Sequence, residues 1–260
     1  MSHRDWLCLS LTEGIGPTLV GRIVEATGSA AAACEAGANL LATIEGIGTS
    51  RATKIAKALV EARAQVDDEL AKIAAKPQVG LVCRDDESYP FLLRNLPDAP
   101  LILYTWGTLE PRDLNAIAIV GSRKCSFYGR EQAERFGAML SGAGFTVISG
   151  GARGVDSAAH RGAMQTVNGR TVAVLGSGID VPYPPENAAL FAQIAERGCV
   201  MSEYPMGTPP LKDNFPKRNR VVSGMSRGVI VIEADELWSF VGSKADVRWV
   251  WVALDAATRR

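Results

Sequence analysis

Short runs of hydrophobic residues recur along the middle of the chain, and each is followed by a stretch with helical spacing. The runs are four or five residues long and rich in β-branched side chains, at 117–120, 145–149, 171–175, 199–202 and 229–232. Unbroken apolar runs separated by helices are typical of parallel strands buried on both faces. The pattern predicts an α/β fold with a doubly wound, mostly parallel sheet.

The same pattern places the helices and two earlier strands. Before the central region, apolar runs at 79–83 and 101–106 predict strands, with a helix between them. The helices are expected at 88–96, 129–143, 155–167, 186–197 and 217–226.

Residues 5 to about 75 are alanine-rich and helical in pattern. A short motif occurs twice in them, as Glu-Gly-Ile-Gly at 13–16 and at 45–48, and each copy precedes a helix-like stretch. This resembles tandem helix-hairpin-helix units, whose hairpin amides can bind a nucleic-acid backbone. The alternative is two tight turns in a small helical bundle.

These patterns divide the chain into three parts. We predict a small all-α domain of helix-hairpin-helix (SAM-like) type over 1–75, because Lys76-Pro77 ends the helical pattern. The α/β domain then covers 76–234. Composition changes sharply afterwards, since three of the five tryptophans fall within 235–260. That last stretch is predicted to be a separate tail.

Composition narrows the functional classes. With 47% hydrophobic and 22% charged residues the chain is of ordinary globular type, and its net charge of zero means that any nucleic-acid site must be a local patch. The five cysteines are scattered without a C-x-x-C pair, which argues against zinc and for a reducing compartment. No signal peptide and no apolar run of membrane-spanning length is present. We expect a cytoplasmic protein without membrane association.

The strand ends predict where a ligand binds. In doubly wound sheets the ligand lies outside the carboxyl ends of the parallel strands. Three of the four ends are glycine-bearing, and the richest is the turn from Ser149 to Asp156, Ser-Gly-Gly-Ala-Arg-Gly-Val-Asp. Glycines allow close backbone approach and the following helix offers unpaired N–H groups, so this corner suits a phosphate. Gly150, Gly151 and Arg153 are therefore candidate binding residues.

Two further segments carry suitable side chains. Ser122 and Arg123 follow the first central strand and could grip a phosphate, although Arg123 could instead pair with a surface carboxylate. The stretch 212–227 holds five basic residues and one acid, with Phe215 beside them. An aromatic face next to basic groups suits single-stranded nucleic acid. The alternative is a solvated helix start with Phe215 in the core.

Evidence for catalysis is weaker. Asp156 and His160 lie four residues apart and so share one helix face. They could form an acid/base pair or half of a metal site. Alternatively, Asp156 caps the helix and His160 makes a local hydrogen bond. Glu203 and Glu233 lie at strand ends without an activated nucleophile nearby. The glycine-rich turn does not fit G-x-G-x-x-G, has no Walker lysine and has no acidic ribose reader at the usual offset, which argues against dinucleotide oxidoreductases and P-loop NTPases. We expect no cofactor.

Taken in order, the motifs resemble one family. They are Gly-Ser-Arg at 121–123, Ser-Gly-Gly-Ala-Arg-Gly-Val-Asp-Ser-Ala-Ala-His at 149–160, Ala-Val-Leu-Gly-Ser-Gly-Ile-Asp at 173–180, Tyr-Pro at 183–184, Ser-Glu-Tyr-Pro at 202–205 and Asn-Phe-Pro-Lys-Arg-Asn-Arg at 214–220. Together they resemble the DNA-processing protein A (DprA, or Smf) family over residues 5–234. The resemblance implies a Rossmann-like sheet and a cytoplasmic, non-enzymatic protein of natural transformation. Its expected partners are single-stranded DNA, a RecA-type recombinase and a second copy in a homodimer.

The family's DNA contacts transfer to matching positions in this sequence. They are Ser122, Arg123, Gly150, Gly151, Arg153, Phe215, Lys217, Arg218 and Asn219. An enzyme alternative is a phosphoribohydrolase resembling the lysine-decarboxylase-like group on a similar sheet. That group has a Pro-Gly-Gly-x-Gly-Thr turn followed by a catalytic glutamate, and the turn at 149–154 lacks the proline and the threonine.

The tail departs from this family. Residues 235–260 are patterned as a strand, a polar turn at 242–244 and a second strand, and they resemble the opening hairpin of an insertion-sequence transposase with a ribonuclease-H-like core. Asp235 would match its first metal-binding carboxylate, but one carboxylate cannot assemble a two-metal site. We expect a C-terminally truncated family member with impaired function, lowered stability and an inactive tail.

Overall fold

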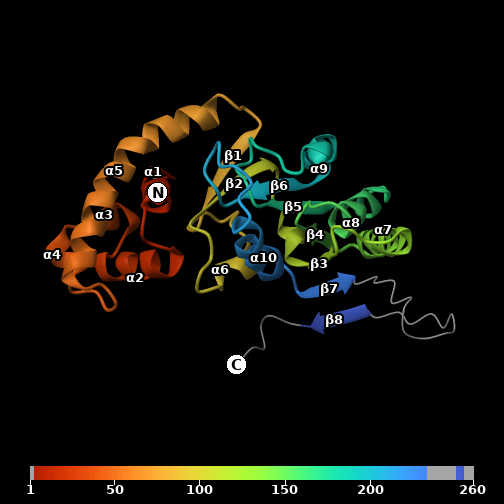
Figure 1. The fold of residues 1–260 in the computed structure, drawn as a ribbon, viewed down its shortest axis with the longest axis horizontal. Helices are drawn as coiled ribbons and strands as arrows, with labels where there is room; N and C mark the ends of the chain where they lie inside the picture. Colours follow the sequence, from red (N-terminus) through yellow and green to blue (C-terminus); the bar gives the residue numbers. More distant parts are fainter. Residues whose placement is uncertain (1–2, 233–249, 255–260) are drawn as a thin grey trace.

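One eight-stranded sheet forms the centre of the α/β part, with the strand order β1-β2-β6-β5-β4-β3-β7-β8 (Figure 1). The computed structural model of the chain describes residues 3–232 and 250–254. The strands are β1 Val79–Cys83, β2 Ile102–Gly107, β3 Ala116–Gly121, β4 Thr146–Ser149, β5 Thr171–Leu175, β6 Cys199–Ser202, β7 Gly228–Ile232 and β8 Val250–Leu254.

The central strands β6, β5, β4, β3 and β7 are parallel. The chain steps from β3 through β4 and β5 to β6, and then crosses back to β7 on the other side of β3. This reversal confirms the predicted doubly wound, mostly parallel sheet. The pairs β1–β2, β2–β6 and β7–β8 are antiparallel.

Helices cover both faces of this sheet, as the unbroken apolar runs predicted (Figure 1). Val147 packs with α7 and α8, whereas its neighbour Ile148 packs with α10 on the opposite face. The helices α7 Phe127–Gly142, α8 Val155–Met164 and α9 Ala188–Arg197 cover the first face, and α6 Phe91–Arg94 and α10 Asn214–Gly224 cover the second. Gly162 of α8 lies so close to α7 that a Cβ atom there would overlap the carbonyl oxygen of Glu134.

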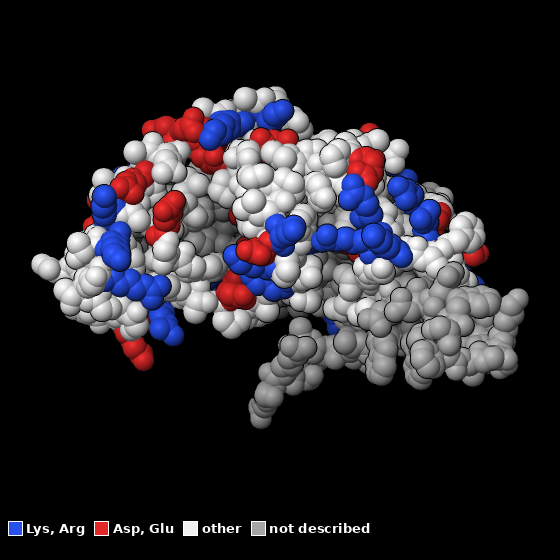
Figure 2. Space-filling model, viewed as in Figure 1, with Lys and Arg blue, Asp and Glu red and all other residues white. Residues whose placement is uncertain are grey.

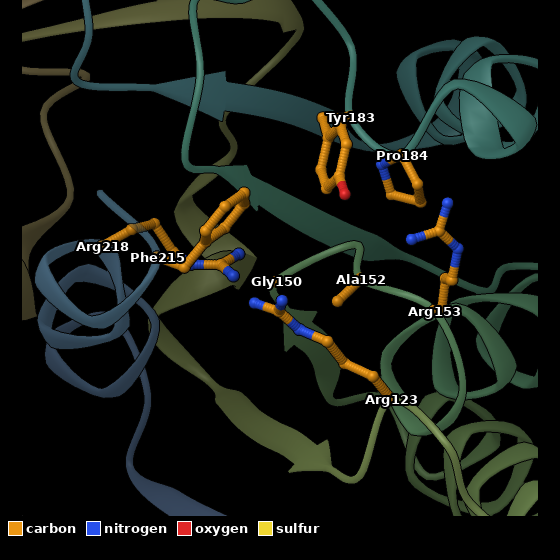
Figure 3. Close-up of a pocket in the computed structure, with 8 residues that line it drawn as sticks. All are labelled: Arg123, Gly150, Ala152, Arg153, Tyr183, Pro184, Phe215 and Arg218. Atoms are coloured by element: carbon orange, nitrogen blue, oxygen red, sulfur yellow. The ribbon is translucent and has the colours of Figure 1, made fainter. Parts of the chain in front are cut away.

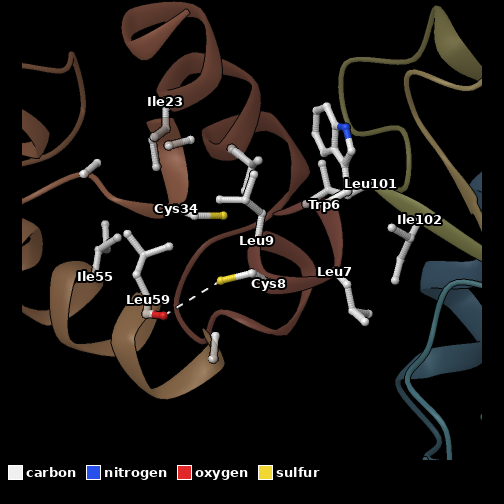
Figure 4. Close-up of a cluster of buried hydrophobic side chains, with 14 of the residues drawn as sticks. Trp6, Leu7, Cys8, Leu9, Ile23, Cys34, Ile55, Leu59, Leu101 and Ile102 are labelled. Carbon is white, nitrogen blue, oxygen red and sulfur yellow. Dashed lines mark hydrogen bonds between the residues drawn. The ribbon is translucent and has the colours of Figure 1, made fainter. Parts of the chain in front are cut away.

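The N-terminal helices pack against the antiparallel edge of the sheet. They are α1 His3–Leu11, α2 Pro17–Thr27, α3 Ala30–Cys34, α4 Ala38–Leu41 and α5 Thr49–Ala74. Their hydrophobic core continues onto Leu101 and Ile102, which lie beside Trp6 and Leu7 (Figure 4). The helices end at Ala74 and the sheet begins at Val79, but the domain boundaries themselves stay a prediction.

The two glycine hairpins lie next to each other. Gly14 and Gly46 both have left-handed backbone conformations, with φ of 80° and 85°. Arg51 donates from its guanidinium to the carbonyl oxygens of Gly14 at 3.3 Å and of Gly46 at 3.4 Å. Arg22 likewise donates to the carbonyl oxygen of Glu45 at 3.3 Å. These two basic side chains therefore hold the hairpins together, which supports the structural interpretation of the repeat.

Several elements differ from the sequence pattern. The helix expected at 88–96 is only α6, because Pro90 stands immediately before it. In contrast, α10 begins at Asn214, three residues before the expected start, so the basic segment is helical from its first residue. At the far edge, β8 pairs with β7. The rest of the transposase-like prediction, at 235–249 and 255–260, lies outside the described residues.

In the described part of the chain, no helix has both the length and the hydropathy needed to cross a bilayer.

Candidate nucleic-acid interface

A small pocket opens where the carboxyl ends of β4 and β5 meet the start of α10 (Figure 3). This is the position that the strand ends predicted. Five of the nine candidate residues lie together in its lining, and three residues that were not among the candidates join them. The lining is formed by Arg123, Gly150, Ala152, Arg153, Tyr183, Pro184, Phe215 and Arg218.

The glycine turn after β4 forms the floor of the pocket. Its backbone requires glycine at Gly151 and Gly154, which have φ of 67° and 74°. A Cβ atom at Gly154 would overlap the carbonyl of Ser122, and the N–H of Val155 donates to that carbonyl at 3.2 Å. The turn is thereby joined to the loop after β3, which brings Arg123 beside it.

Arg218 lies beneath this turn as a buried cation. It is only 3% exposed, and one guanidinium nitrogen donates to the carbonyl oxygen of Val174. Its Nε has no hydrogen-bond partner among the described residues. Burial lowers the pKa of Arg218, and the carboxylate of Asp156 opposes that shift. The pocket thus contains a largely desolvated positive charge, which favours an anionic ligand.

Two arginines flank a pair of aromatic rings around the pocket. The guanidinium of Arg123 lies over the ring of Phe215, 4.8 Å from its centroid. Phe215 contacts Tyr183, with centroids 5.6 Å apart and rings tilted by 45°. Arg153 in turn lies 5.7 Å from the centroid of the Tyr183 ring. Phe215 is therefore half-buried at the surface of the pocket, and it is not a plug in the core.

Arg153 already has an anionic partner at the rim. Its Nη2 donates to Oε2 of Glu186 at 3.0 Å, and its Nε donates to the other carboxylate oxygen. The contact with Arg153 lowers the pKa of Glu186. Both side chains are half exposed, so solvent screens the pair and a phosphate can compete for Arg153. Asn187 holds this loop in place by donating to the carbonyl oxygen of Gly151 at 3.0 Å.

The other four candidates do not line the pocket. Lys217 and Asn219 are exposed on α10, and Ser122 is exposed beside Arg123, where its Oγ accepts from the N–H of Lys124 at 3.1 Å. Gly151 is buried behind Gly150. Sequence reasoning left out Tyr183 as a site residue although Tyr-Pro was among the family motifs. Its position could have identified it, because it is an aromatic residue soon after the carboxyl end of β5, where a ligand is expected.

Asp156 and His160 point into the protein interior. Asp156 accepts from the N–H of Ala152 at 3.3 Å and lies under the turn, where burial raises the pKa of its carboxyl. His160 is fully buried, and its Nδ1 shares a 2.7 Å hydrogen bond with Oγ1 of Thr171. The hydrogen bond of His160 agrees with the local interpretation. Asp156 is not the helix cap that was expected, because Gly154 is the N-cap of α8 and no side chain caps this helix.

His160 should make the fold sensitive to acid. Burial, assisted by the nearby charges of Arg218 and Arg161, lowers the pKa of His160 to about 3. Since the unfolded chain binds this proton near pH 6.5, stability is lost as pH falls from about 6.5 towards 3. Between pH 7 and pH 5 the contribution of His160 alone to this loss is expected to be about 2 kcal/mol, obtained by urea denaturation as the difference from a variant that lacks the imidazole.

The variant His160→Asn isolates the contribution of His160 to acid sensitivity. Its side-chain amide can still hydrogen-bond to Oγ1 of Thr171, but it does not titrate. Burial raises the pKa of Asp156 and of Glu203, so both carboxyls act in the opposite direction, but they are present in both proteins. The variant should lose less stability between pH 7 and pH 5. If the unfolding free energies of the two proteins changed equally with pH, His160 would not be the group responsible for the acid sensitivity.

Charge on this face is locally positive although the chain is neutral overall. Figure 2 shows a row of Lys and Arg side chains across the middle of the molecule, with isolated acidic residues among them. Because the net charge of the chain is zero, a nucleic-acid site requires a local positive patch of this kind.

Comparison with known proteins adds independent information. The family model described as "DNA recombination-mediator protein A" matches residues 80–239. Protein Smf of Synechocystis sp. is 37% identical over 234 residues, which are 88% of this chain and 58% of that relative. The chain spans 42% to 58% of the length of the curated relatives it matches.

Two solved structures are similar over most of the fold. The X-ray structure of DNA processing protein A from Streptococcus pneumoniae has a TM-score of 0.73 and 31% identity, covering 91% of this chain and 80% of that one. The Helicobacter pylori DNA processing protein A, described with a single-stranded DNA binding mode, has a TM-score of 0.53 and 30% identity, covering 62% and 71%.

Proposed function

Because the chain belongs to the DNA recombination-mediator protein A family, we propose that it binds single-stranded DNA in the pocket formed by the Gly150 turn, Arg123, Phe215 and Arg218. The single-stranded DNA binding of the Helicobacter pylori relative supports this ligand. The proposed activity is to hold a strand, and it requires no cofactor.

The observation that carries the proposal is the pair of aromatic rings, Phe215 and Tyr183, in the same pocket lining as the buried Arg218. Arg123 lies against the first ring and Arg153 against the second. Guanidinium groups neutralise and hydrogen-bond phosphates, whereas aromatic faces stack on bases. Bases in a duplex are already stacked on each other, so aromatic rings in the pocket favour a single strand. Stacking accepts any base, so binding should depend little on sequence.

The lining does not suit the phosphoribohydrolase alternative. It consists of arginine, aromatic, proline, glycine and alanine side chains, without a carboxylate, histidine or thiol that could act as general acid, base or nucleophile. Glu186 at the rim is paired with Arg153. A free nucleoside monophosphate could still occupy the phosphate subsite, so it serves as a competitor in the binding experiment.

Within the family role, we propose that the strand is passed to a RecA-type recombinase during natural transformation, and that the chain forms a homodimer. The description of the family as a recombination mediator supports the first part. Both are tested with the full chain, by recombinase filament assembly on coated single strands and by mass measurement in solution.

The function is tested by gel shift with a poly-dT oligonucleotide over a range of salt concentrations. Arg123→Ala combined with Lys217→Ala should reduce affinity at least about tenfold and lower the salt slope by about 1.4, because two charges that neutralise phosphates of a single strand are removed. Lys76→Ala combined with Arg135→Ala removes the same charge from exposed positions outside the pocket lining and should change little.

Two results would overturn the proposal. One is binding that is indifferent to both substitutions and to salt, and the other is no binding by the unmodified chain. Displacement of poly-dT by dTMP at similar concentration would instead indicate a mononucleotide site, since a strand gains from several contacts at once.

A further inference from the structure

Three side chains of metal-ligand type meet where the N-terminal helices join the sheet. His3 is the first residue of α1, Cys83 is the last residue of β1, and Asp86 lies in the turn that follows. One ligand atom of each lies within 4.8 Å of the others, the single such group that the described residues contain. The sequence argued against zinc because its cysteines form no C-x-x-C pair, whereas His3 and Cys83 meet only in the fold.

Two of the three ligand atoms already have a suitable separation. Nε2 of His3 lies 3.1 Å from Oδ2 and 3.3 Å from Oδ1 of Asp86. In a tetrahedral zinc site with metal–ligand distances of about 2.0 Å, neighbouring nitrogen and oxygen ligands are about 3.3 Å apart. The sulfur of Cys83 lies within 4.8 Å of both ligand atoms, so a side-chain rotation of Cys83 or His3 can bring all three to zinc-ligand distances.

The Cys83 thiol is unusual among the buried thiols of the protein. Those of Cys8, Cys34 and Cys199 each contact a backbone carbonyl oxygen. The thiol of Cys83, in a residue only 1% exposed, makes no hydrogen bond with the described residues. A sulfur without a hydrogen-bond partner, next to an imidazole and a carboxylate, can bind a metal once the thiol loses its proton.

Hydrogen bonds hold the ligands in place, and acidic and basic groups both lie nearby, since Arg94 donates to the carbonyl oxygen of Asp86 at 2.6 Å. Asp86 is oriented by the N–H of Cys83, which donates to Oδ2 at 2.8 Å. The adjacent Asp85 accepts from Nε1 of Trp6 at 2.9 Å and adds a second negative charge. Hydrogen bonds of this kind to ligands and their neighbours are typical of metal sites.

We propose that His3, Cys83 and Asp86 bind one zinc ion, with solvent in the fourth position. A thiolate, an imidazole and a carboxylate together select zinc over magnesium or calcium, which prefer oxygen ligands only. On binding, the thiol proton is released to solvent and the sulfur becomes the metal ligand. The ion ties the start of α1 to the end of β1, and it thereby stabilises the contact between the helices and the sheet.

The test is zinc binding by the full chain, from which every affinity tag has been removed because His-tags bind zinc. Competition with a chromogenic chelator should show one zinc ion per chain. His3→Ala should weaken zinc binding at least tenfold, and this variant is expected to fold because His3 is exposed. Cys125→Ala, a cysteine outside the cluster, is the matched control and should bind zinc as the unmodified chain does.

Cobalt substitution tests the sulfur ligand directly. Co²⁺ bound to the unmodified chain should show a thiolate-to-cobalt charge-transfer band, and Cys83→Ala should lack it while Cys125→Ala retains it. Zinc should also raise the melting temperature of the unmodified chain but not that of His3→Ala. Equal zinc affinity of the unmodified chain and His3→Ala, or absence of the cobalt band, would overturn the proposal. Neither readout involves DNA.

Discussion

Gly150→Ala is expected to reduce the affinity for single-stranded oligonucleotides by about 10- to 100-fold while leaving the chain folded. The backbone at Gly150 is not in the left-handed region, so alanine is tolerated there. Its Cβ, however, would overlap the guanidinium of Arg218. Arg218 must then leave the position under the turn, and the pocket loses its buried positive charge.

Fluorescence anisotropy with labelled poly-dT measures this effect. Gly142→Ala is the matched control, because its Cβ would have no neighbour nearer than 3.6 Å. The double variant Gly150→Ala/Arg218→Met should bind DNA with nearly the same affinity as Arg218→Met alone, because both substitutions act through the same guanidinium. Unchanged affinity and salt slope in Gly150→Ala would refute the role given to Arg218.

Arg170→Met is expected to destabilise the fold by about 3–5 kcal/mol. Arg170 is only 2% exposed and forms a bidentate pair with Asp113, at 2.6 and 2.7 Å. It also donates to Oε1 of Glu110 at 3.0 Å and to the carbonyl oxygen of Thr108 at 2.5 Å. Removing the guanidinium leaves the carboxylate of Asp113, 7% exposed, buried without its cation.

Urea denaturation should show a lower midpoint with an unchanged slope. Arg112→Met removes the exposed arginine that contacts Glu110 at 2.7 Å and should cost less than about 1 kcal/mol. Because Arg170 lies at the amino end of β5 and the pocket lies at the carboxyl end, DNA affinity of the folded variant should be unchanged. A destabilisation no larger than that of Arg112→Met would show that the buried pair contributes nothing.

The position of the pocket was predictable because it follows from strand order and strand ends alone. Runs such as 171–175 identify parallel strands, and the glycine-rich segment after Ser149 marks the end where a ligand can approach. The role of Arg218 could not be predicted from the sequence. From the sequence it is one of several basic residues in 212–227, and only the fold turns it inward while Lys217 stays exposed.

Pairings between residues that are distant in the sequence could not be predicted either, because they form only when the chain folds. Arg51 joins hairpins that are 32 residues apart, and Arg170 pairs with a carboxylate 57 residues away. Either side chain is, by type and position, an ordinary basic residue. Their roles follow from which carbonyl or carboxylate lies within hydrogen-bond distance, which no local pattern encodes.

The sequence by itself determined the sheet, its covering helices and the glycine turn at 149–154, because hydrophobic periodicity and backbone freedom are local properties of the chain. Only the tertiary structure decided which charged groups are buried and which meet. Arg218 under Gly150, Asp113 with Arg170, and His3 with Cys83 and Asp86 are each brought together by packing of distant segments. The free energy of a charge depends on its desolvation and its partners, and both are set only when the chain is folded.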